Sequence, residues 1–110
     1  MQHDVKDQGG HLIVAFLGDI DLQSSPEARK VLLGAVEQEK AILVDLSGVE
    51  YIDSSGVASL VESFQKARKS GQEYILVSLS DGARRVLELS RLDKVFTICA
   101  TIDEAAAQLD

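Results

Sequence analysis

The segment Asp53-Ser54-Ser55-Gly56 carries the clearest chemical signal in this chain of 110 residues. It places a hydroxyl at the expected start of a helix, where free backbone N–H groups and the helix dipole favour an anion. A phosphate on Ser54 is therefore tolerated at this position. Gly56 keeps the surrounding surface low, which leaves room for another protein to approach. The alternative is that Ser54 or Ser55 only caps the helix, a common use of serine.

The residues around the two serines do not favour a hydrolase. A nucleophile elbow has glycine two residues before the serine, whereas Ile52 and Asp53 occupy those positions here. The two histidines, His3 and His11, both lie in the N-terminal segment, with no evident triad partner nearby in the sequence. We therefore expect no enzymatic activity and no catalytic residue.

Other chemistry-bearing residues favour structural roles. Asp19 and Asp21 resemble a metal pair, but without a further ligand they are typical of solvated loop acids, so no metal site is expected. No glycine-rich phosphate-binding loop is present, and no cofactor is expected. The single cysteine, Cys99, is predicted to pack as a small apolar residue. Tyr51 and Phe64 are predicted to belong to the core.

The composition excludes several classes of partner. Eighteen acidic residues against eleven basic ones give a net charge of −7, which disfavours direct binding to nucleic acid or to an anionic membrane. The longest apolar run, residues 12–17, is far shorter than the roughly 20 residues that cross a bilayer. Residues 1–8 are polar and lack the apolar region of a secretory signal. We therefore expect no membrane insertion and a cytoplasmic location.

Two hydrophobic periodicities alternate along the chain and predict the elements that position these residues. Strands are expected at residues 4–8, 12–17, 41–46, 74–79 and 95–98, with a hairpin turn at residues 9–10. Helices are expected from Pro26, from within residues 53–55 to Gly71, after a cap at Ser80 or Asp81, and after a capping box of Thr101 with Glu104. For the first helix, Ser25 is a candidate cap, and Ser24 with Glu27 fits a capping box.

This order of elements (β-β-α-β-α-β-α-β-α) predicts the fold class. Strands that alternate with helices imply crossover connections and a parallel sheet, and the N-terminal hairpin adds an antiparallel edge. We expect an α/β fold with a mixed, mostly parallel sheet of about five strands and helices packed against it. Residues 1–110 contain no linker or repeat and are predicted to form a single domain.

Four segments together resemble the STAS domain family, in particular the bacterial anti-sigma factor antagonists. They are GDID at residues 18–21, VDLS at 44–47, DSSG at 53–56 and RVLELSRL at 85–92. Each segment is weak evidence alone, but their order and spacing match the family over nearly the whole chain.

The resemblance implies a partner switch. In the family, an anti-sigma factor that is also a serine kinase phosphorylates the serine after the aspartate, which is Ser54 here. The unmodified domain captures the anti-sigma factor, phosphorylation releases it, and a PP2C-type phosphatase restores binding. The expected binding face comprises Asp19, Asp21, Asp53, Ser54, Ser55 and Gly56. We expect Asp19, Asp21 and Glu50 to lie near Asp53, so that a phosphate adds to an acidic surface.

One residue departs from the family pattern. Antagonists often have a second glycine two residues after the first, and this chain has Ala58 there. Similar alanine-bearing stretches resemble the small STAS subunits of lipid-transport ABC permeases. A regulatory subunit that docks on a permease or its ATPase is therefore the alternative function.

Overall fold

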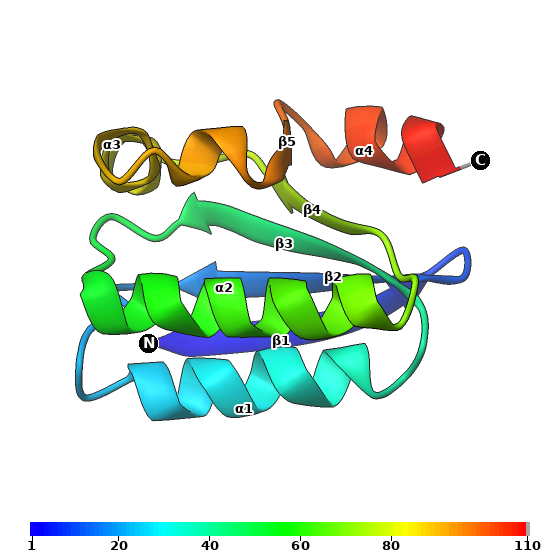
Figure 1. The fold of residues 1–110 in the computed structure, drawn as a ribbon, viewed down its shortest axis with the longest axis horizontal. Helices are drawn as coiled ribbons and strands as arrows, with labels where there is room; N and C mark the ends of the chain where they lie inside the picture. The colour runs from blue at the N-terminus through cyan, green and yellow to red at the C-terminus, as the bar shows by residue number, and fades with distance from the viewer. Residues whose placement is uncertain (110) are drawn as a thin grey trace.

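A five-stranded sheet runs through the structure, a computed structural model that describes residues 1–109 (Figure 1). β1 (Gln2–Gln8) and β2 (His11–Leu17) form an antiparallel hairpin. Both residues of its turn have positive φ, +69° at Gly9 and +94° at Gly10, which glycine adopts without strain. β3 (Ala41–Gly48), β4 (Tyr74–Val77) and β5 (Thr97–Cys99) continue the sheet in parallel. The predicted mixed sheet is confirmed.

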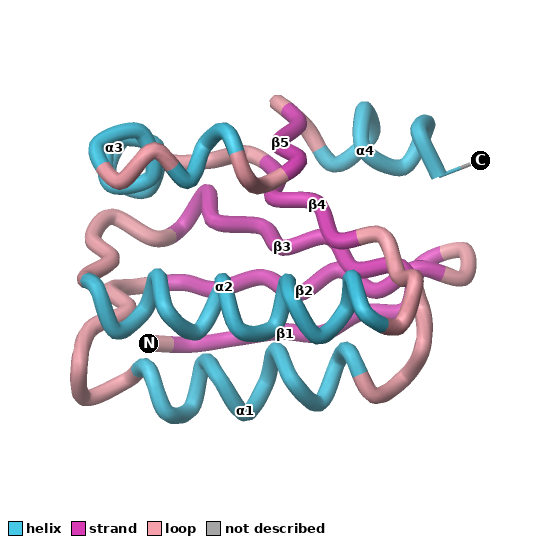
Figure 2. Tube along the Cα trace, in the orientation of Figure 1, coloured by secondary structure: helices cyan, strands magenta, loops and turns pink. Residues whose placement is uncertain are grey.

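Four α-helices connect or follow the parallel strands, in the predicted order (Figure 2). They are α1 (Ser25–Val36), α2 (Ser54–Lys69), α3 (Asp81–Leu89) and α4 (Ile102–Leu109). A short 3-10 helix, η1 (Leu92–Lys94), was not predicted. The N–H groups of Val95 and Phe96 both donate to the carbonyl of Leu92 in η1, so the last strand begins at Thr97, two residues later than expected. The fourth strand ends at Val77, since Ser78 turns out of the sheet with φ of +54°.

The two faces of the sheet have separate cores. On one face, alternate residues of β2, β3 and β4 pack with α1, α2 and α3, and the largest of them are fully buried. Phe64 and Phe96 meet edge-to-face in this core, with ring centroids 4.9 Å apart, as predicted for Phe64. On the other face, Cys99 is 6% exposed and packs beside Ala105 of α4. Burial raises the pKa of its thiol, which fits the predicted apolar role.

The helix caps follow the sequence only in part. The Ser80 hydroxyl accepts a hydrogen bond from the N–H of Ala83, and the Thr101 hydroxyl accepts one from the N–H of Glu104, as expected. Of the two caps considered for α1, Ser25 is wrong, since it is the first helical residue. Ser24 occupies the N-cap position, as the capping box requires, but its hydroxyl bonds Asp21 and makes no hydrogen bond to the helix.

The carboxyl ends of β2 and β3 lie side by side because the two strands are parallel neighbours. The connection from β2 to α1 and the connection from β3 to α2 therefore leave the sheet at the same end (Figure 1). The acidic residues of the first connection are in this way brought to the start of α2.

Candidate functional site

Asp53 caps α2 and thereby determines the state of the two serines that follow it. Its backbone is extended, with φ of −97° and ψ of −174°. One carboxylate oxygen, Oδ1, accepts hydrogen bonds from the N–H of Ser55 at 3.0 Å, the N–H of Gly56 at 3.1 Å and the Ser55 hydroxyl at 2.5 Å. The bond from the Ser55 hydroxyl is the main reason why the pKa of Asp53 lies below its ordinary value. The alternative in which a serine caps this helix is therefore wrong.

The two serines differ in their availability for chemistry. Ser54 is the first residue of α2 and is exposed. Within the described residues 1–109, its hydroxyl has no hydrogen-bond partner. Ser55 is half-buried, and its hydroxyl is held by Asp53. The Ser54 hydroxyl is therefore free to react, whereas the Ser55 hydroxyl already donates a hydrogen bond to Asp53.

The loop between β2 and α1 lies directly against the start of α2. Ile20 and Ile52 form an isolated parallel bridge, and the N–H of Asp53 donates to the Ile20 carbonyl at 3.1 Å. The backbone N–H of Leu22 helps to lower the pKa of Asp53. The fold thus joins residues separated by about thirty positions into one surface, which the spacing of the motifs alone does not establish.

Asp21 is the second ordered carboxylate of this surface. Its Oδ1 accepts from the N–H groups of Gln23 and Ser24, both at 3.0 Å, and from the Ser24 hydroxyl at 3.1 Å. These bonds, that of the Ser24 N–H above all, lower its pKa, while the negative charge of Asp53 opposes the shift. The expected proximity of Asp21 to Asp53 is therefore visible in their electrostatic interaction.

Asp19 and Glu50 occupy the margins of this surface. The Asp19 side chain is exposed, and its carbonyl accepts a hydrogen bond from the Ser24 hydroxyl at 3.1 Å. The Glu50 backbone packs against α3, since a Cβ built on Gly82 would lie 1.9 Å from the Glu50 carbonyl oxygen. Glu50 therefore adjoins the start of α3, and its expected nearness to Asp53 stays a prediction.

Gly56 faces inward, which differs from the reason given for it above. It is buried, and a Cβ built on it would lie 2.7 Å from Ile52 Cγ1 and 2.8 Å from Ile20 Cγ2. Its lack of a side chain lets α2 approach the two loops closely. Its immediate contribution is to position Asp53 and Ser54. Ala58, one helical turn after Ser54, is exposed on the outer face of α2.

Two apolar side chains at this end of the molecule were not identified from the sequence. Leu22 is 75% exposed and Tyr51 is 52% exposed, so the prediction that Tyr51 belongs to the core is wrong. Their neighbours Ile20 and Ile52 take the inward positions, at 1% exposure each. Exposed leucine and tyrosine beside ordered carboxylates are typical of a protein-binding surface.

The free amides expected at this helix start are only partly available. The N–H groups of Ser55 and Gly56 are occupied by the Asp53 carboxylate. A phosphate on Ser54 would therefore lie at a helix N-terminus whose nearest N–H groups already donate to the Asp53 carboxylate. Its charge would then add to those of Asp53 and Asp21 on the outer surface.

Residues 1–109 nowhere bring three histidine, cysteine or acidic side chains together in an arrangement that would hold a metal ion. Within the same residues, no helix has both the length and the apolar character needed to cross a bilayer.

Comparison with known proteins places this geometry in context. The STAS domain model matches residues 2–105. The anti-sigma-B factor antagonist of Bacillus subtilis (strain 168) is 31% identical over 97 residues, which cover 88% of this chain and 89% of the relative. An anti-sigma factor antagonist from Mycobacterium paratuberculosis has a similar structure, with a TM-score of 0.90 at 29% identity over 97% of this chain and 92% of that one.

SpoIIAA of Bacillus shares the fold at lower sequence similarity. Its unphosphorylated and phosphorylated forms match with TM-scores of 0.80 and 0.75, each at 20% identity. The matches cover 98% and 99% of this chain, and 96% and 100% of the SpoIIAA chains.

Proposed function

Because this chain belongs to the STAS domain family, we propose that it is an anti-sigma factor antagonist that works by partner switching, with Ser54 as the switch residue. In its unmodified form it binds an anti-sigma factor and so frees the sigma factor. Phosphorylation of Ser54 ends this binding. Residues 1–110 act as one STAS domain, and the mode of action is binding, not catalysis.

The state of the Ser54 hydroxyl carries the proposal. It is exposed and without a partner in the described structure, whereas Asp53 holds the hydroxyl of Ser55 at 2.5 Å. A serine kinase transfers the γ-phosphoryl group of ATP to a serine oxygen and releases ADP and a proton. This transfer needs a hydroxyl that can enter another protein's active site, and Ser54 meets the requirement.

The proposed binding face is the acidic surface described above. It comprises Asp19, Asp21, Asp53, Ser54 and Ser55, with Gly56 supporting it from within. Leu22 and Tyr51 add exposed apolar area at its border. Burial of these two side chains against a partner supplies affinity, while the carboxylates select a partner with a basic surface.

Phosphorylation acts on this face through charge. It adds about −1.5 to −2 charges next to two carboxylates whose pKa values are already held low, so all of these groups are ionised together. The Asp53 cap remains in place, so the domain keeps its fold. Phosphorylation therefore weakens the complex with the partner, because it introduces repulsion between like charges and a desolvation penalty at the interface.

The proposed partners are an anti-sigma factor with serine kinase activity and a PP2C-type phosphatase that removes the phosphate. The site of action is the cytoplasm, without direct contact with DNA. The names of the relatives favour this reading over a subunit of a lipid-transport permease, since the Bacillus subtilis and Mycobacterium paratuberculosis proteins are both named antagonists.

A reconstituted transcription assay tests the proposal. RNA polymerase with its sigma factor is inhibited by the anti-sigma factor kinase, and the unmodified chain should restore transcription when ADP is present. With ATP, the wild-type chain should become phosphorylated and lose its effect. Ser54→Ala should remain active with ATP, and Ser54→Asp should bind about tenfold or more weakly, because a fixed negative charge faces the partner.

Ser55→Ala is the matched control, because it removes the neighbouring hydroxyl and leaves Ser54 in place. Phosphopeptide mapping should find the phosphate on Ser54 in both the wild type and this control. A phosphate on another residue, or unchanged phosphorylation of Ser54→Ala, would remove the support for the switch.

A further inference from the structure

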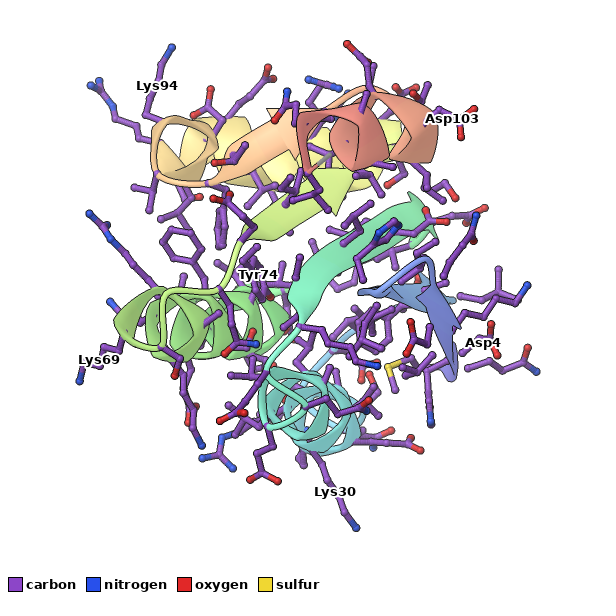
Figure 3. The ribbon with its side chains drawn as sticks, turned by 90° about the vertical axis from the view of Figure 1, so that its right-hand side faces the viewer. Asp4, Lys30, Lys69, Tyr74, Lys94 and Asp103 are labelled. Carbon is purple, nitrogen blue, oxygen red and sulfur yellow. The ribbon has the colours of Figure 1, made fainter. Side chains whose placement is uncertain are left out.

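The first strand of the sheet has an open edge. β1 pairs with β2 on one side, and no strand of residues 1–109 lies on its other side. All seven of its residues, Gln2–Gln8, are exposed. Figure 3 shows Asp4 projecting from the outer side of the molecule. An uncovered, proline-free edge of this length is a template for pairing with another strand.

The hairpin register determines which backbone groups of β1 face this edge. Residues on either side of a two-residue turn form a hydrogen-bonded pair, and bonded and non-bonded pairs then alternate along the ladder. The flanking pair is Gln8 with His11. Alternation from this pair directs the N–H and C=O groups of His3, Val5 and Asp7 to the open edge.

The side chains of β1 are arranged symmetrically about Val5. Reading outward from it, Asp4 is matched by Lys6, His3 by Asp7, and Gln2 by Gln8. When two copies of this strand run antiparallel with Val5 opposite Val5, each Asp4 therefore faces a Lys6, and the opposition occurs twice. Opposite charges on facing residues stabilise an antiparallel pair. The same register places the outward-facing backbone groups of the two strands opposite one another.

Charge also disfavours the neighbouring registers. A shift that centres the pair on Asp4 sets two carboxylates against each other, and a shift that centres it on Lys6 sets two ammonium groups against each other. Within residues 1–109, neither Asp4 nor Lys6 has an ion-pair partner. His3 already contacts Glu27 of α1, and Asp7 contacts Lys40. The choice among the possible pairing registers therefore depends on Asp4 and Lys6.

We propose that β1 is a homodimerisation edge, which pairs antiparallel with β1 of a second copy around Val5 and joins the two sheets into one. Three residues on each strand then supply about six backbone hydrogen bonds. A single strand pair is smaller than a standard interface of about 800 Å² per partner, so the dimer is weak and depends on concentration. Met1, which precedes this edge, lines a pocket together with Asp19 and Asp21. The pairing is centred on Val5, and the dimer does not depend on the proposed switch.

Sedimentation velocity of the intact protein, from micromolar to about 1 mM, tests this dimer. The wild type should show a reversible monomer–dimer equilibrium. Asp4→Lys sets a second ammonium group opposite Lys6, and Lys6→Asp sets a second carboxylate opposite Asp4, so each variant should raise the dimer Kd about tenfold or more. Both positions are exposed, and circular dichroism verifies that the variants fold.

Mixing the two variants provides the decisive measurement. In the mixed pair, the two lysines of one strand face the two aspartates of the other, so a heterodimer should form at concentrations at which each variant alone stays largely monomeric. The double variant Asp4→Lys/Lys6→Asp should dimerise like the wild type. A wild type that stays monomeric, single variants that dimerise unchanged, or a mixture without heterodimer would each overturn the proposal.

Discussion

Replacing Gly56 by alanine tests whether the start of α2 is held in place by close packing. A methyl group there would lie 2.7 Å from Ile52 Cγ1, 2.8 Å from Ile20 Cγ2 and 2.9 Å from the Ile20 carbonyl oxygen. Both isoleucines are 1% exposed, and that carbonyl accepts the hydrogen bond from the Asp53 N–H. The contacts can therefore relax only if α2 moves away from the loop that carries Asp21.

The expected effect is the difference between two terms. Alanine gains about 1 kcal/mol over glycine in a helix interior, and less in a first turn. Overpacking of a core costs about 1–3 kcal/mol, and three simultaneous contacts, one of them with backbone, favour the upper end of this range. The net loss is about 1–2 kcal/mol. For 110 residues the unfolding entropy is about 0.23 kcal/mol per kelvin, so Tm should fall by about 4–9 °C.

Gly34→Ala is the matched control for this prediction. Gly34 is exposed within α1, and a Cβ there would meet no atom within 4 Å, so alanine should stabilise the protein by about 0.5–1 kcal/mol. Urea unfolding followed by circular dichroism measures both variants against the wild type. A Gly56→Ala protein that is as stable as the wild type would refute the packing argument, whatever the control shows.

Two further predictions concern titratable groups. Asp53 has a lowered pKa in the fold, so its contribution to stability is present above its ordinary value of 3.8 and is lost as the pH falls through the lower folded value. Asp53→Asn still caps the helix, so its urea midpoint should fall less than that of the wild type upon acidification to about pH 2, and parallel curves would contradict this. Burial raises the pKa of Tyr74, whose hydroxyl lies 2.7 Å from that of Ser63. In Tyr51→Phe, which leaves Tyr74 as the only tyrosine, tyrosinate absorbance should appear only as the circular dichroism signal of the fold is lost; earlier ionisation would contradict the burial.

Local patterns account for what could be predicted about the fold. Periodicity of apolar residues and helix-start signals act over a few positions, so they were sufficient for the order of elements, the hairpin and the start of α2. They could not reveal η1, because a short 3-10 turn has no repeat long enough to recognise. They also assigned Tyr51 to the core, since a loop residue next to a buried isoleucine has no periodicity that indicates its direction.

By itself, the sequence determined the fold class and indicated the few residues of the proposed site, because hydroxyls, carboxylates and their spacing are properties of the chain. Only the tertiary structure decided which of these residues caps α2 and which keeps a free hydroxyl. Asp, Ser and Thr cap helices with similar preference, so the choice of Asp53 as the cap, and hence the free hydroxyl of Ser54, depends on backbone geometry. The position of Asp21 beside Asp53 depends on the parallel pairing of β2 with β3, a contact between residues far apart in the chain.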